Sequence, residues 1–344
     1  MRRVDVRDAP PHGWDAFVRA HPDGTPFHLS AWSLRVAEGL GTRVRWLVSM
    51  DGAAIAGVLP LHHVRSVLFG SRLVSSPQAA YGGPVAQDGG VASALVEAAT
   101  AEAERLGVGY LELRLRQDGP STQGGRWHGS DLHVTIGGPI AADADAILAA
   151  VPKKTRADCR KADEALVAEE SPRQFAAFHA LFAENQRDLG TPVLPRRFLR
   201  SVADCAELGA RVLVVRHGEV PVAACLSLAY ADRVLPYWAG ASSAALALHP
   251  NHGLYLNVLR RARAAGLSTF DFGRSRRGSG SYDFKRRWGF AEAPLAYRYR
   301  LVRAQSPPDL NPANPKYHRK IEAWKKLPLW AANAVGPILS PGLS

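Results

Sequence analysis

The stretch Ser268–Phe290 reads STFDFGRSRRGSGSYDFKRRWGF. Phe270 and Phe272 alternate with Asp271 and Gly273, which is the period of a half-buried β-strand. The alternation predicts a short strand that ends near Gly273.

A segment rich in arginine and glycine follows this strand. Guanidinium groups pair with phosphate and carboxylate oxygens, and glycines let main-chain amides turn toward an anion. We therefore predict a donor-binding or substrate-binding segment made of Arg274, Ser275, Arg276, Arg277, Gly278 and Gly280. The alternative is a solvated basic loop, which is the usual state of such a segment on a protein surface.

A second basic cluster, Lys285 to Arg287, lies between Phe284 and Trp288. A loop surrounded by solvent has no use for large aromatic side chains at these places. The aromatic residues therefore favour a segment that is anchored to the core, with its basic groups directed at a ligand.

The composition indicates a folded protein with anionic partners. The chain has 344 residues, of which 47% are hydrophobic, so two domains of similar size are expected. Lys and Arg number 43 against 31 Asp and Glu, which gives a net charge of +12. This charge favours nucleic acid, phosphorylated molecules or a membrane surface as partners.

The three cysteines are Cys159, Cys205 and Cys225, which are odd in number and widely spaced. They predict neither a disulfide framework nor a metal site. The N-terminus lacks the apolar segment of a signal peptide, and the apolar run Val220–Ala231 is too short to cross a bilayer. We expect a cytoplasmic protein that can still lie on the cytoplasmic face of a membrane.

The order of predicted elements repeats along the chain as helix, strands, helix, strand. The turn Asp51-Gly52 predicts a hairpin, residues 91–106 a helix, and residues 110–115 a strand. The fold class is therefore α/β (α+β), with two domains that each contain a mixed central sheet flanked by helices. We place an N-terminal domain at residues 1–150, a C-terminal domain at 151–303 and a tail at 304–344.

Other residues of the second half are candidates for the same site. Tyr237 and Trp238 lie on a predicted strand that should neighbour the Phe270 strand, although core packing is the alternative for each. Asn251, His252 and Gly253 precede a predicted helix and can offer main-chain amides to a phosphate.

Several motifs together resemble those of the FemAB-like proteins of exosortase (XrtA)/PEP-CTERM systems, a branch of the Fem/GNAT acyltransferase superfamily. The matching segments are FHLSAW at 27–32, LPLHHVRS at 59–66, YGGP at 81–84, KKTRADCRKA at 153–162, LGTPVLP at 189–195, LPYWAG at 235–240, FDFGRS at 270–275, YDFKRRWGF at 282–290 and the tail segment at 311–333. In this order they cover nearly the whole chain.

The resemblance implies two tandem GNAT-like domains and transfer of an acyl or aminoacyl group to an amine, with the donor held by the second domain. It also implies that Lys285 stabilises the reacting carbonyl and the donor phosphate, and that the setting is cell-envelope or exopolysaccharide biosynthesis. No tightly bound cofactor is expected. The donor is an aminoacyl-tRNA or an acyl-CoA, and the usual pyrophosphate loop of CoA-dependent relatives is absent.

Acyl transfer to an amine also needs a route for the amine proton. Asp271 and Tyr282 are candidates for this role, and a structural role in binding nearby arginines is the alternative for Asp271. The chain has no G-x-S-x-G elbow, H-E-x-x-H or Walker loop, which argues against hydrolase, zincin and NTPase functions. The alternative function is a non-catalytic GNAT-like module that binds an anionic glycolipid or RNA.

The tail contains the segment WKKLPLW at 324–330, which mixes tryptophan, lysine and apolar residues. This mixture is typical of segments at a membrane surface, so peripheral contact with the inner membrane is one prediction. Packing of the tail against the protein is the other.

Overall fold

The computed structural model describes residues 3–66, 70–117, 119, 122, 127–307 and 315–343. The chain forms two compact units. The first unit contains residues 1–133, 294–310 and 341–344, and the second contains residues 134–293 and 311–340.

The first unit is built mainly from strands. Its strands are β1 (Val4–Arg7), β2 (Arg43–Asp51), β3 (Ala54–Ser66), β4 (Gly70–Ser75), β5 (Val85–Ala86), β6 (Tyr110–Leu115), β7 (Trp127–Ser130) and β15 (Ala296–Leu301). Its helices are α1 (Trp14–Ala20), α2 (Ser30–Leu40) and α3 (Gly89–Leu106). The predicted hairpin is confirmed, because β2 and β3 pair antiparallel across Asp51-Gly52.

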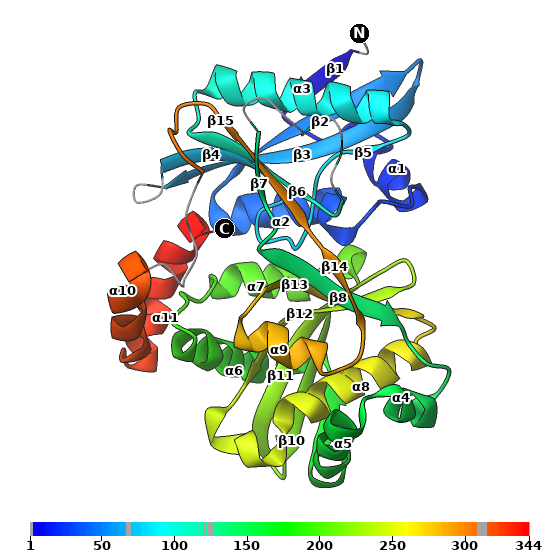
Figure 1. Cartoon of the computed structure of the whole chain (residues 1–344), viewed down its shortest axis with the longest axis vertical. Helices are drawn as coiled ribbons and strands as arrows, with labels where there is room; N and C mark the ends of the chain where they lie inside the picture. The colour runs from blue at the N-terminus through cyan, green and yellow to red at the C-terminus, as the bar shows by residue number, and fades with distance from the viewer. Residues whose placement is uncertain are drawn as a thin grey trace. The chain divides into compact units, whose positions relative to one another are not determined.

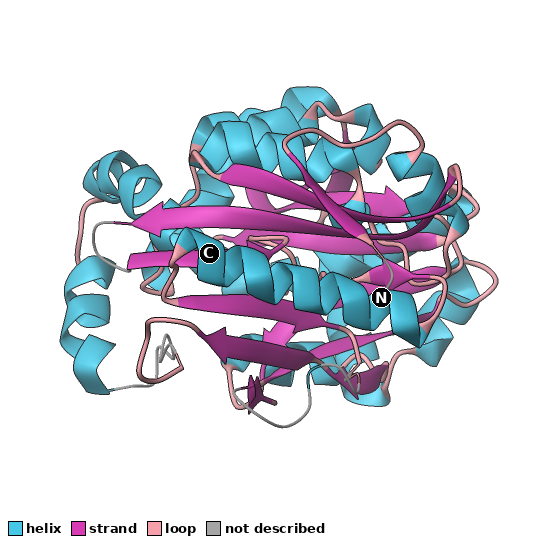
Figure 2. Ribbon diagram, turned by 90° about the horizontal axis from the view of Figure 1, so that it is seen from above, coloured by secondary structure: helices cyan, strands magenta, loops and turns pink. Residues whose placement is uncertain are grey.

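The sheet of the first unit has the strand order β1-β2-β3-β4-β6-β15-β7, with β5 beside β3. Helix α3 lies across one face of this sheet (Figures 1 and 2), where its apolar residues and those of the strands form one buried core. The side chains of β2 alternate between the two faces. Leu47 belongs to the core under α3, whereas the Trp46 ring contacts Trp14 of α1 on the other face.

The second unit alternates strands and helices. Its strands are β8 (His133–Pro139), β9 (Val167–Glu170), β10 (Arg211–His217), β11 (Val220–Tyr230), β12 (Arg233–Ala241), β13 (Thr269–Arg276) and β14 (Ala291–Pro294). Its helices are α4 (Ala144–Ala150), α5 (Lys153–Ala165), α6 (Phe175–Asp188), α7 (Arg196–Ala203), α8 (Pro250–Ala264), α9 (Gly280–Arg286), α10 (Pro315–Lys325) and α11 (Leu329–Leu339).

The sheet of the second unit has the strand order β14-β8-β13-β12-β11-β10-β9. α8 packs against β10, β11 and β12, and its apolar residues join Phe270, Phe272 and Trp288 in one buried core. α6 packs against the same strands, in part through its stripe of phenylalanines. The predicted fold class, α/β with two mixed sheets flanked by helices, is confirmed (Figure 1).

The two units do not follow the linear order of the chain. β8 lies within residues 1–150 but hydrogen-bonds in the second sheet, and β15 lies within residues 151–303 but hydrogen-bonds in the first. β15 pairs with β6 along its whole length, from Ala296 with Leu115 to Leu301 with Tyr110. The division observed therefore differs from the boundaries placed at 150 and 303, because strand pairing joins segments that are distant in the sequence.

The tail from residue 304 contributes to both units. Helices α10 and α11 pack against α6. Gly336 lets α11 approach closely, since a Cβ atom at this position would lie 2.9 Å from the main-chain nitrogen of Val193. Among the residues described, the structure has no helix with both the length and the apolar character needed to cross a membrane.

Candidate functional site

The candidate site lies where the parallel strands β12 and β13 part. Their register pairs Arg233 with Thr269 and Val234 with Phe270, at the start of both strands. β12 then continues to Ala241 and β13 to Arg276, without further pairing between them. α8 forms the crossover between these strands, as a parallel connection requires.

Lys285 extends from α9 toward β13. Its Nζ donates to the main-chain oxygen of Phe272 at 2.9 Å and lies 5.5 Å from the centre of the Phe272 ring. Burial lowers the pKa of Lys285 to about 8; the Asp271 carboxylate opposes this shift, and the Arg274 guanidinium adds to it. The ammonium is thus held near β13 in a place where few water molecules screen its charge.

The charge of Lys285 also acts on the thiol of Cys225 in β11. Burial raises the pKa of this thiol, and the charge of Lys285 opposes the rise. Cys225 pairs with Ala239 in the part of β12 that has separated from β13. The charge of Lys285 is thus close enough to β11 to act on the Cys225 thiol, while its hydrogen bond holds it at β13.

α9 begins directly after the turn in the arginine-glycine segment. Ser279 caps the helix, and its Oγ accepts from the amide of Tyr282 at 3.3 Å. The strand before it runs to Arg276, beyond the predicted end near Gly273. Sequence patterns missed this helix because it is only one to two turns long and begins with glycine and serine.

Asp271 is buried and fully engaged by neighbours. Its Oδ1 accepts from Thr135 Oγ1 at 2.5 Å and from the amide of Gly273 at 2.8 Å, and its Oδ2 lies 3.6 Å from Arg233 Nη1. Only 4% of the residue is exposed. The carboxylate is therefore positioned to support the charge of Lys285, and its contacts favour the structural alternative over proton transfer.

Tyr282 is directed at β14. Its hydroxyl donates to Glu292 Oε2 at 2.8 Å, and Glu292 also forms an ion pair with Arg277. These three residues form a link between α9, the preceding turn and β14. Tyr282 and Arg277 are thus joined to each other, whereas Lys285 points to β13.

The remaining residues of the segment differ in exposure. Arg274 is exposed and Arg276 is partly buried. Gly278 in the turn and Gly280 at the start of α9 are both exposed. Ser275 is 3% exposed, and its Oγ has no hydrogen-bond partner among the residues described. Since the charge of Arg274 acts on Lys285, Arg274 is the arginine of this segment that shares the site.

Tyr237 and Trp238 lie at a bulge in β12. Leu226 pairs with Trp238 while Ser227 pairs with Pro236, so Tyr237 is the extra residue. Bulges redirect side chains and are common beside active sites. Tyr237 is partly buried, whereas Trp238 is 8% exposed and its ring contacts Phe198.

The start of α8, predicted to offer main-chain amides to a phosphate, uses two of these amides within its own first turn. The amides of His252 and Gly253 donate to the oxygen of His249 at 2.9 and 3.2 Å. A Cβ atom at Gly253 would lie 3.2 Å from that of Ala162, so the glycine allows α5 and α8 to pack closely. Asn251 is partly buried and does not cap the helix.

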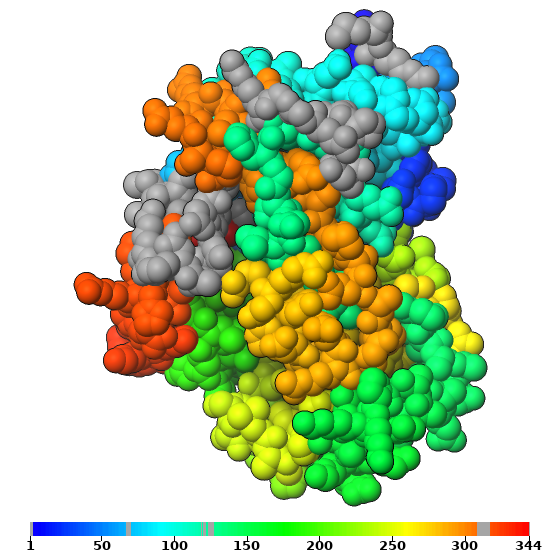
Figure 3. Space-filling model, viewed as in Figure 1, coloured from blue at the N-terminus to red at the C-terminus, as the bar shows by residue number. Residues whose placement is uncertain are grey.

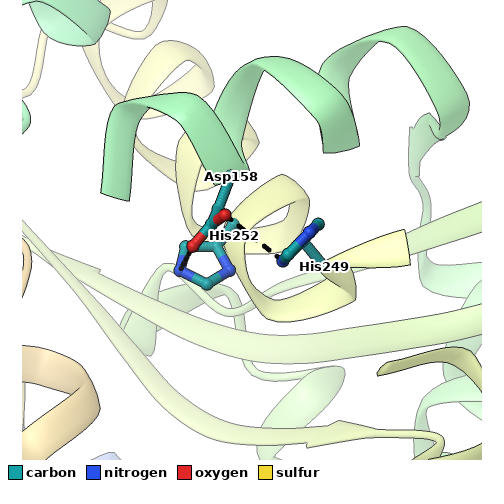
Figure 4. A group of neighbouring side chains, drawn as sticks. All are labelled: Asp158, His249 and His252. Carbon is teal, nitrogen blue, oxygen red and sulfur yellow. Dashed lines mark ion pairs between the residues drawn. The ribbon is translucent and has the colours of Figure 1, made fainter. Parts of the chain in front are cut away.

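Three side chains beside this turn form a group that sequence reasoning missed. Figure 4 shows Asp158 of α5 between His249 and His252. His249 Nδ1 lies 3.7 Å from Asp158 Oδ1, and His252 Nε2 lies 3.8 Å from Oδ2. Burial lowers the pKa of His252, which keeps its imidazole neutral at pH 7. Two imidazoles and a carboxylate are ligands that zinc accepts, so these are residues that could hold a metal ion.

A cavity of about 490 Å³ lies in the first unit, apart from these residues. Arg45 and Arg105 line it, and both form ion pairs with Glu102. Arg43 lines the cavity as well, so its wall is basic, but none of the residues predicted for the site lies in its lining.

Part of the chain matches the model of a known protein family. Residues 152–286, which include α8, α9 and Lys285, match the acetyltransferase (GNAT) domain model. No curated protein sequence matches the chain.

Two solved structures resemble the chain over most of its length. FemX shares 14% identity with a TM-score of 0.67, covering 92% of this chain and 99% of its own. L-PGS from Bacillus licheniformis shares 15% identity with a TM-score of 0.55, covering 92% of this chain and 98% of its own. The chain therefore has the fold of these proteins and carries a match to the GNAT acetyltransferase domain in its second unit.

Proposed function

We propose that the protein transfers an acyl or aminoacyl group from an activated carbonyl donor to an amine. The main observation behind this proposal is the partly buried ammonium of Lys285, which is held at the place where β12 and β13 separate. The GNAT match over residues 152–286 and the fold shared with FemX and L-PGS support the reaction class.

The parted strands suit an extended donor. A peptide-like or pantetheine-like chain can hydrogen-bond to strand edges that no longer pair with each other, as in strand addition to a sheet. Such a donor would bring its carbonyl toward the oxygen of Phe272, where Lys285 Nζ lies.

Lys285 would stabilise the reacting carbonyl. As the amine nitrogen bonds to the carbonyl carbon, negative charge develops on the carbonyl oxygen, and a fixed ammonium lowers the energy of that state. The carbon–oxygen or carbon–sulfur bond to the donor carrier then breaks. The amine loses one proton and the leaving oxygen or sulfur gains one, so the reaction is balanced.

We assign Asp271 a positioning role in this reaction. Its hydrogen bonds with Thr135 and Gly273 fix the carboxylate, and its charge raises the pKa of Lys285 against the effect of burial. It therefore keeps Lys285 protonated at neutral pH. Tyr282 would support α9 through Glu292 and would not itself move the proton.

The start of α8 favours a donor other than CoA. A CoA donor would place its pyrophosphate at a helix N-terminus. At the start of α8, however, the Asp158 carboxylate lies beside the first turn, and two main-chain amides of this turn already donate to the oxygen of His249. The two engaged amides are not free to bind a phosphate at this place. An aminoacyl-tRNA is therefore our preferred donor, and we retain an amine of the cell envelope or an exopolysaccharide as the acceptor class.

The test measures product from a donor panel that includes acetyl-CoA and aminoacyl-tRNAs, with amine acceptors and mass spectrometric detection. We expect Lys285→Met to reduce turnover about 100-fold or more, as loss of an oxyanion partner does. Lys161→Met, on the exposed face of α5, is the matched control and should keep wild-type turnover.

Two results would argue against the proposal. Undiminished transfer by Lys285→Met would remove Lys285 from the reaction. Absence of product from every donor, together with glycolipid or RNA binding that Lys285→Met retains, would support a non-catalytic binding module.

A further inference from the structure

Helix α11 exposes an apolar face to solvent. Its sequence, LWAANAVGPIL, contains no charged residue. Trp330, Ala334 and Ile338 are four residues apart and share one face of the helix. Trp330 is 75% exposed and Ile338 77% exposed, and Val335 beside them is 42% exposed. A helix on a protein surface normally presents polar residues there.

The opposite face of α11 is packed against the second unit. Ala332 is 2% exposed, and Gly336 lies against Val193 as described above. Figure 1 shows α11 beside α6, the helix that it contacts. Packing of the small residues therefore fixes the rotation of α11 and directs Trp330 and Ile338 outward.

Basic side chains precede this apolar face in the sequence. Exposed basic residues of α10 and the following turn are Arg319, Lys320, Lys325 and Lys326. One carboxylate, Glu322, pairs with Lys325 at 2.8 Å. In the space-filling view, the orange-red atoms of α10 lie at the surface beside the green atoms of α6 (Figure 3). The helix pair therefore combines exposed tryptophan and aliphatic groups with a net positive charge.

We propose that α10 and α11 form a docking surface for an anionic lipid bilayer. α11 has 11 residues, which is too short to cross the hydrocarbon core, so it would lie along the membrane surface. Trp330 and Ile338 would enter the boundary between headgroups and acyl chains, and the lysines would contact acidic headgroups.

The positive charge of α10 and the following turn favours an anionic bilayer over a second copy of the chain as the partner. The exposed apolar face could also be covered by self-association, but two copies would bring the same basic helices together and these would repel. An anionic surface attracts them. The inference goes beyond transfer chemistry, and it stands or fails independently of the role of Lys285.

The test is flotation of the full chain with vesicles in 0.15 M NaCl. One set contains phosphatidylcholine with 30% phosphatidylglycerol, and the other contains phosphatidylcholine alone. We expect binding to the anionic vesicles. Trp330→Ser/Ile338→Ser should lower the partition coefficient about tenfold or more, because each large side chain contributes transfer free energy on burial.

The control for the apolar variant is Val167→Thr/Val220→Thr. Both valines are exposed, at 72% and 62%, and both lie on strands of the same unit away from α11. This variant should bind vesicles as the wild type does. Equal losses in both variants would show that exposed apolar area in general causes binding, which would overturn the proposed site.

A second pair of variants tests the charge. Lys325→Gln/Lys326→Gln should bind anionic vesicles about 25-fold more weakly, since each lysine near an acidic surface contributes about fivefold. Arg160→Gln/Lys161→Gln removes two exposed charges from α5 and should bind as the wild type does.

Two outcomes would overturn the inference. One is no flotation of the wild type with anionic vesicles. The other is a dimer in light scattering that Trp330→Ser/Ile338→Ser converts to a monomer, because the apolar face would then be an interface between copies.

Discussion

Replacing Lys285 by methionine removes an ammonium that the fold holds at an energetic cost. The pKa of Lys285 falls from 10.5 to about 8, mainly through burial. The folded state therefore binds the proton less tightly than the unfolded state does. Lys285→Met retains the length and apolar stem of the side chain while deleting the charge.

The size of the expected change in the free energy of unfolding follows from the pKa shift of Lys285. A difference of about 2.5 pKa units corresponds to about 3 kcal/mol. Solvent reaching the partly buried side chain reduces this to about 2 kcal/mol. At pH 7 we expect Lys285→Met to raise the free energy of unfolding by this amount and to raise the melting temperature by about 4 to 8 °C.

The pH dependence provides a sharper test. Below pH 8 the lysine is charged in both states, so the wild type bears the full cost. Between pH 8 and 10.5 the unfolded state binds more protons, and the stability of the wild type gains on that of the variant as pH rises. Most of the difference between the two proteins should therefore disappear by about pH 9.5 to 10.

The assay is denaturant unfolding of both proteins from pH 6.5 to 10, with Lys161→Met as the exposed control. The control should differ from the wild type by a small amount that does not change with pH. A Lys285→Met protein that is less stable than the wild type at pH 7, or a difference that is constant with pH, would refute a buried ammonium. Stabilisation together with loss of transfer would instead show that stability is exchanged for function at this site.

Three further outcomes are expected. Asp271→Asn removes a charge that raises the pKa of Lys285, so the alkaline limb of the transfer rate should move to lower pH; an unchanged limb in the pH–rate profile would contradict the coupling. Gly336→Leu forces side-chain atoms onto Val193 and should lower the free energy of unfolding by about 1 to 3 kcal/mol in denaturant titration, whereas an unaltered value would show that α11 is not packed there. Asp88→Ala removes the carboxylate that caps α3 by accepting a hydrogen bond from the main-chain amide of Val91. The free energy of unfolding should fall by about 1 kcal/mol in the same titration. An unchanged value would show that the cap is not formed.

Local sequence patterns were sufficient for most of the elements. The strand predicted at 110–115 coincides with β6, and the helix predicted at 91–106 coincides with α3 within two residues. The alternation of Phe270 and Phe272 with Asp271 and Gly273 also located β13, but the expectation of a half-buried strand was wrong, because Asp271 and Gly273 are buried as well. Each of these signals depends on side-chain periodicity, which reports which residues face a core.

Contacts between distant segments followed from the tertiary structure alone. β8 and β15 hydrogen-bond in sheets that their positions in the chain do not suggest, because strand pairing depends on a partner elsewhere in the sequence. Asp158 meets His249 and His252 only because α5 packs on α8.

The candidate site, like the fold, was predicted from the sequence only in part. The residue types from Phe270 to Trp288 indicated a basic segment anchored by aromatic side chains, and the resemblance to the Fem/GNAT proteins singled out Lys285. Only the fold decided that Lys285 turns to the oxygen of Phe272 while Tyr282 turns to Glu292, since side chains on one short helix point in different directions. The sequence thus determined which chemical groups are present, and packing determined which of them meet.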